Sequence, residues 1–143
     1  MTAIALKKAT ESLLAEINRL IPQLSSSATA MTLAELEALI NRDGTTLFGI
    51  EEAGEVVGML TLVTFKIPTG TRAWIEDVVV DEKVRGKGFA KALVTAAIDE
   101  ARKAGASTVD LTSRPAREAA NALYRSMGFE QRETNVYRFS LEG

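Results

Sequence analysis

The segment that decides the fold runs from Ile75 to Leu93 and reads IEDVVVDEKVRGKGFAKAL. Its β-branched run predicts a strand, which leads through a loop with two glycines directly into helical spacing. Such a loop presents the free N–H groups and the positive dipole end of a helix to solvent. Gly86 and Gly88 let an anion come close to the backbone. Four basic residues lie in or beside the loop: Lys83, Arg85, Lys87 and Lys91. The segment therefore predicts a pyrophosphate-binding loop.

Two better-known phosphate-binding motifs do not fit this loop. A P-loop requires Lys-Ser or Lys-Thr after its last glycine, whereas Phe89 and Ala90 follow Gly88 here. A dinucleotide-binding fingerprint requires a third glycine at position 91, which is a lysine. The residues alone also allow a purely structural turn with solvated basic side chains, because short glycine motifs often occur by chance.

The composition excludes several kinds of catalytic and binding site. The 143 residues include no cysteine and no histidine, which rules out disulfides, thiolate nucleophiles and Ser-His-Asp triads and removes the usual ligands of transition metals. The net charge of −2 is unlike the basic excess of a nucleic-acid-binding protein. No stretch approaches the ~18 uncharged apolar residues of a membrane-spanning helix. We expect one cytoplasmic domain, residues 1–143, that binds no metal, nucleic acid or membrane.

Further strands and helices are predicted on both sides of the central segment. The expected strands lie at residues 3–8, 46–50, 56–65, 74–80 and 108–111, with one or two more within residues 129–141. The expected helices lie at residues 10–21, where Pro22 ends the helix nearby, and at residues 32–40, 89–104 and 116–127. This order predicts an α/β (mixed α+β) fold, in which helices cover both faces of a mixed sheet. The strands at 74–80 and 108–111 are expected to be parallel, since a helix connects them.

Two segments resemble the GCN5-related N-acetyltransferases. Residues 85–90, RGKGFA, resemble the acyl-CoA signature of that family, Gln/Arg-x-x-Gly-x-Gly/Ala, and lie between a strand and a long helix as that signature does. Residues 119–129, AANALYRSMGF, resemble the later helix of the family, in which a tyrosine precedes Gly-Phe by a few residues. The resemblance covers roughly residues 45–140. It implies the acyl-CoA N-acyltransferase fold, with a mixed and mostly antiparallel central sheet.

The resemblance also implies that acetyl-CoA is the co-substrate. Backbone groups of Val78, Val79 and Val80 would pair with its pantetheine arm. The amides of the loop would hold its pyrophosphate: Arg85, Gly86, Lys87, Gly88, Phe89, Ala90 and Lys91. Many relatives carry a cofactor-contacting asparagine seven residues before the tyrosine, where this sequence has Arg117. Asn121, one helical turn before the tyrosine, would substitute for it in part, unless its amide is satisfied within its own helix.

The implied reaction moves the acetyl group directly to a primary amine, without an acyl-enzyme. Tyr124 would protonate the leaving thiolate, although a tyrosine on the apolar stripe of a helix is also a common core residue. A carboxylate is the obvious acceptor for the proton of the amine. Glu76 and Asp77 are adjacent, so strand alternation should send them to opposite, covered faces and leave at least one desolvated or hydrogen-bonded. We predict that Glu76 is the base; its alternative role is to pair with a nearby cation.

The acceptor is expected to be an amine bound near the N-terminal helices. The loops at Ser25–Met31 and Lys66–Arg72 should border its pocket, and Trp74 lies next to them unless it belongs to the core. A non-catalytic acyl-CoA-binding or sensing module is the first alternative, and it would bind the cofactor without releasing CoA. An interaction protein with a structural glycine turn is the second, and it would not bind CoA. Apolar residues near the end would permit a homodimer: Val136, Phe139 and Leu141.

Overall fold

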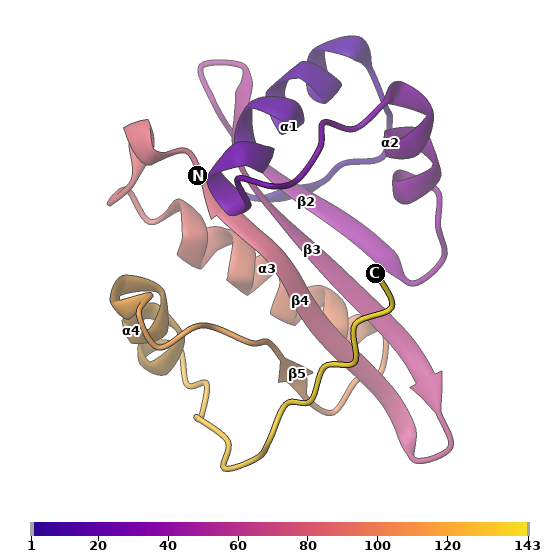
Figure 1. Cartoon of the computed structure of the whole chain (residues 1–143), viewed down its shortest axis with the longest axis vertical. Helices are drawn as coiled ribbons and strands as arrows, with labels where there is room; N and C mark the ends of the chain where they lie inside the picture. Colours follow the sequence, from indigo (N-terminus) through magenta and orange to yellow (C-terminus); the bar gives the residue numbers. More distant parts are fainter. Residues whose placement is uncertain (1, 143) are drawn as a thin grey trace. The chain divides into compact units, whose positions relative to one another are not determined.

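The computed structural model describes residues 2–142 and shows two compact units, one that ends at Leu111 and one that begins at Thr112. Each unit is described by itself. The first contains the sheet and the helices α1, α2 and α3 (Figure 1). The second contains the helix α4 and the segment that follows it.

The sheet has five strands in the order β1-β2-β3-β4-β5. Their bounds are Ile4–Ala5, Thr45–Glu52, Glu55–Ile67, Gly70–Val80 and Val109–Asp110. The first four strands are antiparallel to their neighbours, and β5 is parallel to β4, so the predicted mixed and mostly antiparallel sheet is confirmed. The turn between β2 and β3 has positive φ angles at Ala53 and Gly54, 53° and 83°, as a type I′ hairpin requires.

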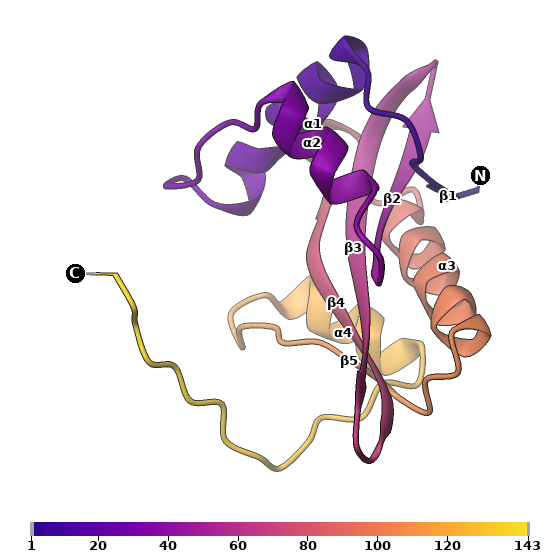
Figure 2. The ribbon, with the colours of Figure 1, turned by 90° about the vertical axis from the view of Figure 1, so that its right-hand side faces the viewer.

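Helices cover both faces of this sheet, as the sequence predicts. α1 (Glu11–Leu24) and α2 (Leu33–Ile40) lie on one face, and α3 (Phe89–Lys103) lies on the other (Figure 2). Thr10 caps α1 by accepting a hydrogen bond from the Leu13 N–H at 3.1 Å. α1 includes Pro22 and ends shortly after it, at Leu24.

Each face of the sheet has its own apolar core. The core beneath α1 and α2 consists of Leu13, Ile17, Leu20, Leu36, Leu47, Val56, Met59 and Val79. On the other face α3 buries Phe89, Leu93, Val94, Ala97 and Ala101. α3 lies close to β3 at Gly58. A Cβ atom built on this glycine would lie only 3.3 Å from a methyl carbon of Leu93. This tight packing fixes the N-terminal end of α3, where the glycine loop enters the helix.

The second unit contains α4, Glu118–Ser126, and ends differently from the prediction. Residues 129–142 contain no strand in the described structure, so the expectation of one or two strands within residues 129–141 is wrong. Alternating apolar residues favour a strand only where a neighbouring strand can pair with them, and no ladder forms along this segment. Four large apolar side chains there are exposed instead: Val136, Tyr137, Phe139 and Leu141.

Candidate active site

The loop between β4 and α3 has the geometry of an anion-binding turn. A 3-10 turn, η1 (Glu82–Val84), opens it, and Gly86 and Gly88 have φ angles of 84° and 82°. Gly88 is the N-cap of α3 and no side chain caps the helix, so its first N–H groups are available to a ligand. A Cβ atom built on Gly86 would meet no atom within 4 Å. The backbone of this loop is thus open to an anion on its solvent side.

The basic side chains of the loop are not equivalent. The Lys87 ammonium lies 3.2 Å from the Glu52 carboxylate, and the Arg85 Nε donates a hydrogen bond to the Val80 carbonyl at 3.3 Å. Both cationic side chains therefore already have a partner within the protein. Lys83 and Lys91 make no side-chain hydrogen bond or ion pair within residues 2–142. At Lys87, accordingly, the backbone N–H rather than the ammonium group is free for a ligand.

The end of β4 next to this loop has a free edge. β4 pairs with β5 only at Ala73 and Trp74, so from Ile75 to Val80 it has no ladder partner on that side among the described residues. Val79 is buried in the core beneath α1 and α2, whereas Val78 and Val80 are half-buried. An unpaired strand edge can accept an extended ligand as an additional strand.

The structure places Glu76 and Asp77 differently from the expectation. Both side chains are exposed, so neither carboxylate is desolvated as the alternation argument predicted. The strand is also irregular here, because it contains a bulge: Glu76 pairs with Thr61 and Val79 pairs with Met59, so two β4 residues lie opposite one β3 residue. Asp77, within the bulge, has a φ angle of 52°.

Glu76 lies on the face of the sheet that carries α1 and α2. Directly paired residues point to the same side, and Glu76 pairs with Thr61, which itself pairs with Leu47 of the core beneath those helices. The helices cover the Val79 end of this face and leave the Glu76 carboxylate exposed. This carboxylate makes no hydrogen bond or ion pair within residues 2–142. Trp74 is two residues earlier on the same face and is half-buried.

Tyr124 lies in the second unit and is 7% exposed. Its ring meets Phe129 edge to face, with the ring centroids 5.7 Å apart. Burial raises the pKa of its phenol above the ordinary value of 10.0, and the charge of Arg117 opposes this in part. The hydroxyl therefore keeps its proton at neutral pH and has one to donate.

Asn121 also belongs to the second unit, where its amide is already used. Its Nδ2 donates a hydrogen bond to the Arg114 carbonyl at 2.9 Å and so ties α4 to the segment before it. A cofactor contact of Asn121 stays a prediction. The first unit brings together Glu76, Val78–Val80 and the loop Arg85–Lys91, and no described geometry joins Tyr124 or Asn121 to them.

The sequence analysis did not single out Asp81, the residue directly after β4. Within residues 2–142 it is the one buried charged residue, with 6% exposure. Its carboxylate accepts a hydrogen bond from the Lys83 N–H at 3.1 Å. The sequence did contain a signal for this role, an aspartate just before a turn. At such a position the Asp carboxylate often accepts a hydrogen bond from the backbone N–H two residues later.

None of the helices within residues 2–142 has both the length and the apolar content to cross a membrane. The same residues contain no group of three or more acidic, histidine or cysteine side chains that could hold a metal ion.

Comparisons with known proteins agree with this geometry. Residues 12–129 match the model of the "Acetyltransferase (GNAT) family". The chain is 35% identical over 99 residues to "Uncharacterized N-acetyltransferase YhdJ" of Bacillus subtilis, which covers 68% of this chain and 70% of that protein. A putative acetyltransferase from Agrobacterium tumefaciens is 28% identical and superposes with a TM-score of 0.86, covering 98% of this chain and 100% of that one.

A more distant structure shares the fold alone. The aminoglycoside N-acetyltransferase AAC(6′)-Iy, solved in complex with CoA, is 17% identical, with a TM-score of 0.79 over 98% of this chain and 93% of that one. The family match covers both the glycine loop and the helix that carries Tyr124. This chain therefore belongs to the acetyltransferase (GNAT) family and is an acyltransferase of the N-acetyltransferase type.

Proposed function

We propose that this protein moves the acetyl group of acetyl-CoA directly to a primary amine. The observation that carries the proposal is the open loop at the start of α3, next to the unpaired edge of β4. An extended pantetheine arm can add to Val78–Val80 as a strand, while the amides of Arg85–Lys91 bind the pyrophosphate. The complex of AAC(6′)-Iy with CoA, in a protein of the same fold, supports this choice of co-substrate.

The proposed chemistry needs one base and one acid. Glu76 accepts a proton from the amine, directly or through water, so that the nitrogen lone pair can form a bond to the thioester carbon. As the C–S bond breaks, Tyr124 donates its hydroxyl proton to the sulfur. Direct transfer requires no cysteine or histidine nucleophile, and the sequence has neither. In this proposal residues 1–143 are one N-acetyltransferase domain.

The exposed part of the α1 and α2 face is the proposed acceptor site. Trp74 and Glu76 lie two residues apart there, next to their β3 partners Val63 and Thr61. A carboxylate beside an indole ring favours a cationic amine attached to an apolar body. The loops at Ser25–Met31 and Lys66–Arg72 border this site in the proposal.

The remaining sequence predictions stay predictions. A homodimer is supported by the exposed Val136, Phe139 and Leu141, which are 76%, 86% and 92% exposed. The cytoplasmic location and the lack of nucleic-acid partners rest on composition alone.

Titration with acetyl-CoA, followed by a panel of amines with free CoA as the readout, tests the proposal. We expect binding, and release of CoA with some amines. Binding without release from a broad panel would favour the non-catalytic acyl-CoA-binding module instead. A protein that does not bind acetyl-CoA would contradict the proposal as a whole.

The acid role is tested by Tyr124→Phe. We expect turnover to fall by about 100-fold, the usual scale for a lost general acid, with acetyl-CoA affinity unchanged. Because burial raises the pKa of Tyr124, the wild-type rate should not decline through loss of this proton until the pH exceeds 10.0. Unchanged turnover in the variant would leave Tyr124 as a core residue only.

A further inference from the structure

The buried carboxylate of Asp81 is the centre of a small network at the start of the glycine loop. The Asp81 N–H donates to the Val57 carbonyl at 2.8 Å, which anchors the residue to β3. Its Oδ1 accepts from the Lys83 N–H at 3.1 Å, and its Oδ2 lies 3.6 Å from the Arg19 Nε. The Nε2 of Gln23 is 3.5 Å from Oδ1. Asp81 thus joins β3, the loop and α1.

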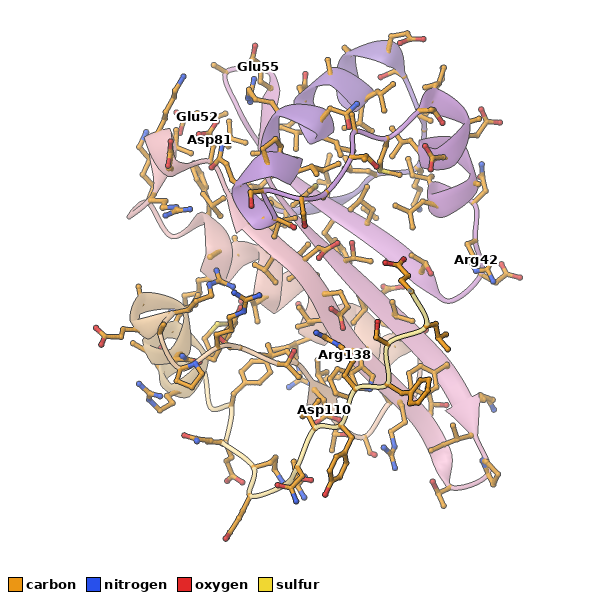
Figure 3. All side chains as sticks on the ribbon, viewed as in Figure 1. Arg42, Glu52, Glu55, Asp81, Asp110 and Arg138 are labelled. Atoms are coloured by element: carbon orange, nitrogen blue, oxygen red, sulfur yellow. The ribbon has the colours of Figure 1, made fainter. Side chains whose placement is uncertain are left out.

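Side chains of α1 hold the same turn from a second direction. The Oε1 of Gln23 accepts a hydrogen bond from the Glu82 N–H at 3.0 Å. Arg19 reaches the Val56 carbonyl at 3.4 Å and the Glu55 carboxylate at 3.5 Å. Two consecutive backbone N–H groups of η1, at Glu82 and Lys83, are therefore bound by Gln23 and Asp81. Figure 3 shows Asp81, Glu52 and Glu55 at the same end of the sheet.

The loop beyond this turn has few other attachments. Gly86, Lys87 and Gly88 are exposed, and the two glycines have positive φ angles that few other residues share. The side-chain contacts within it are the Arg85 bond to Val80 and the Lys87 ion pair with Glu52. The ion pair joins two solvent-exposed side chains, and such pairs typically contribute little to stability; the hydrogen bond to Val80 comes from the exposed Arg85 side chain. The buried end at Asp81 is thus the firmest point from which the loop is oriented.

We propose that Asp81, held by Arg19 and Gln23, is a positioning residue that orients the glycine loop toward the pyrophosphate of acetyl-CoA. The inference rests on the proposed function, because it takes Arg85–Lys91 as the pyrophosphate site. It adds that α1, on the acceptor side of the protein, controls the geometry of the cofactor loop. Loss of this network tilts η1 and misaligns the amides that follow it.

The test compares two donors, acetyl-CoA and acetyl-pantetheine, which differ in the nucleotide and pyrophosphate. Calorimetry gives the dissociation constant of each for the wild type and for Asp81→Ala. We expect the preference for acetyl-CoA to fall by about tenfold in the variant, with acetyl-pantetheine binding unchanged. A purely structural role would weaken both donors alike and leave the preference unchanged, and that result would overturn the inference.

A second variant and a matched control complete the design. Gln23→Ala removes the acceptor of the Glu82 N–H and the Nε2 that donates to the Asp81 Oδ1, and it should lower the preference by about threefold; it decides the question if Asp81→Ala fails to fold. Glu55→Gln removes an exposed partner of the same Arg19 and should leave the preference unchanged. If the wild type binds the two donors equally, the loop is not a pyrophosphate site. That result overturns the proposed function, whereas a wild-type preference that survives in both variants overturns only the role of Asp81.

Discussion

The two ends of β4 differ in how much of the protein holds them. At the loop end, Val79 is buried, Asp81 bonds to β3, and two α1 side chains bind the turn that follows. Further back in the strand lie Trp74 and Glu76, which we call the open end of β4. There Trp74 is half-buried, and the Glu76 carboxylate is exposed without a partner among the described residues. One strand thus has a terminus that many contacts hold in place and, a few residues away, exposed side chains that few contacts hold.

This contrast matches the two tasks of an acetyltransferase. In the proposed reaction the donor is acetyl-CoA alone, so the donor end can be built from backbone geometry and buried contacts. The proposed acceptor site consists of exposed side chains, which can change without cost to the core. The predictions below test whether the two ends separate in this way.

The largest effect is expected from Glu76→Gln. Loss of the proposed base should lower turnover by about 100-fold, while acetyl-CoA affinity stays the same. Asp77→Asn is the matched control, because Asp77 is the adjacent exposed carboxylate and asparagine tolerates its φ angle of 52°. Equal turnover for Glu76→Gln and the wild type would refute the base role.

A second prediction concerns the loop end and compares two glycines. Gly86 and Gly54 have φ angles of 84° and 83°, and at both positions an added Cβ atom would meet nothing within 4 Å. Alanine at either position should cost about 1 kcal/mol of stability through backbone strain. Only Gly86→Ala should also weaken acetyl-CoA binding, by about 30-fold, because its methyl group occupies the path of the anion. Thermal unfolding measures the loss of stability, and calorimetry measures the affinity for acetyl-CoA. If the Gly86→Ala and Gly54→Ala variants bind acetyl-CoA equally well, the loop end has no special role in binding the donor.

Trp74→Ala tests the open end. We expect the KM of the amine acceptor to rise by about tenfold, as the aromatic contact is lost, and the KM of acetyl-CoA to remain unchanged. Steady-state kinetics with each substrate varied in turn give both constants. A rise in the acetyl-CoA constant instead would mean that the two ends of β4 are not independent.

The smallest effect is a pH dependence of stability. The hydrogen bond from the Lys83 N–H, in the main, holds the pKa of Asp81 below its ordinary value of 3.8. A lowered pKa stabilises the fold above pH 3.8, and this contribution is lost as the pH falls through the folded-state pKa. Asp81→Asn should therefore cost about 1 kcal/mol at neutral pH, and the deficit should shrink below pH 3.8 in denaturant titrations. A deficit that does not change with pH would contradict the ionised network.

The sequence alone predicted those elements whose structure depends on neighbouring residues in the chain. The predicted helix at 89–104 is observed as Phe89–Lys103, and the strand at 74–80 lies within Gly70–Val80. The glycine loop follows from φ angles that glycine adopts readily, so its place could be read without knowing the rest of the chain.

The remaining features depend on contacts between distant segments. The bulge at Asp77 exists only relative to β3, and the burial of Asp81 depends on Gln23, 58 positions earlier in the chain. Neither feature leaves a periodic signal in the sequence. At residues 129–141 the sequence predicted a structure that is not observed. Their alternating apolar residues are a typical strand pattern, but they pair with no other strand in this structure.

The bulge in β4 also has a consequence for how sequences of this kind can change. Without it, Glu76 and Val79 would point to opposite faces, since they are an odd number of residues apart. The extra residue shifts the phase of the strand, so a carboxylate and a core valine share one face. Deletion of Asp77 would leave Glu76 and Val79 two residues apart in a regular strand, so both would keep their shared face, whereas deletion of a regularly paired residue elsewhere in the strand would reverse one side of it. Position 77 is therefore where a single-residue gap in β4 should be tolerated best.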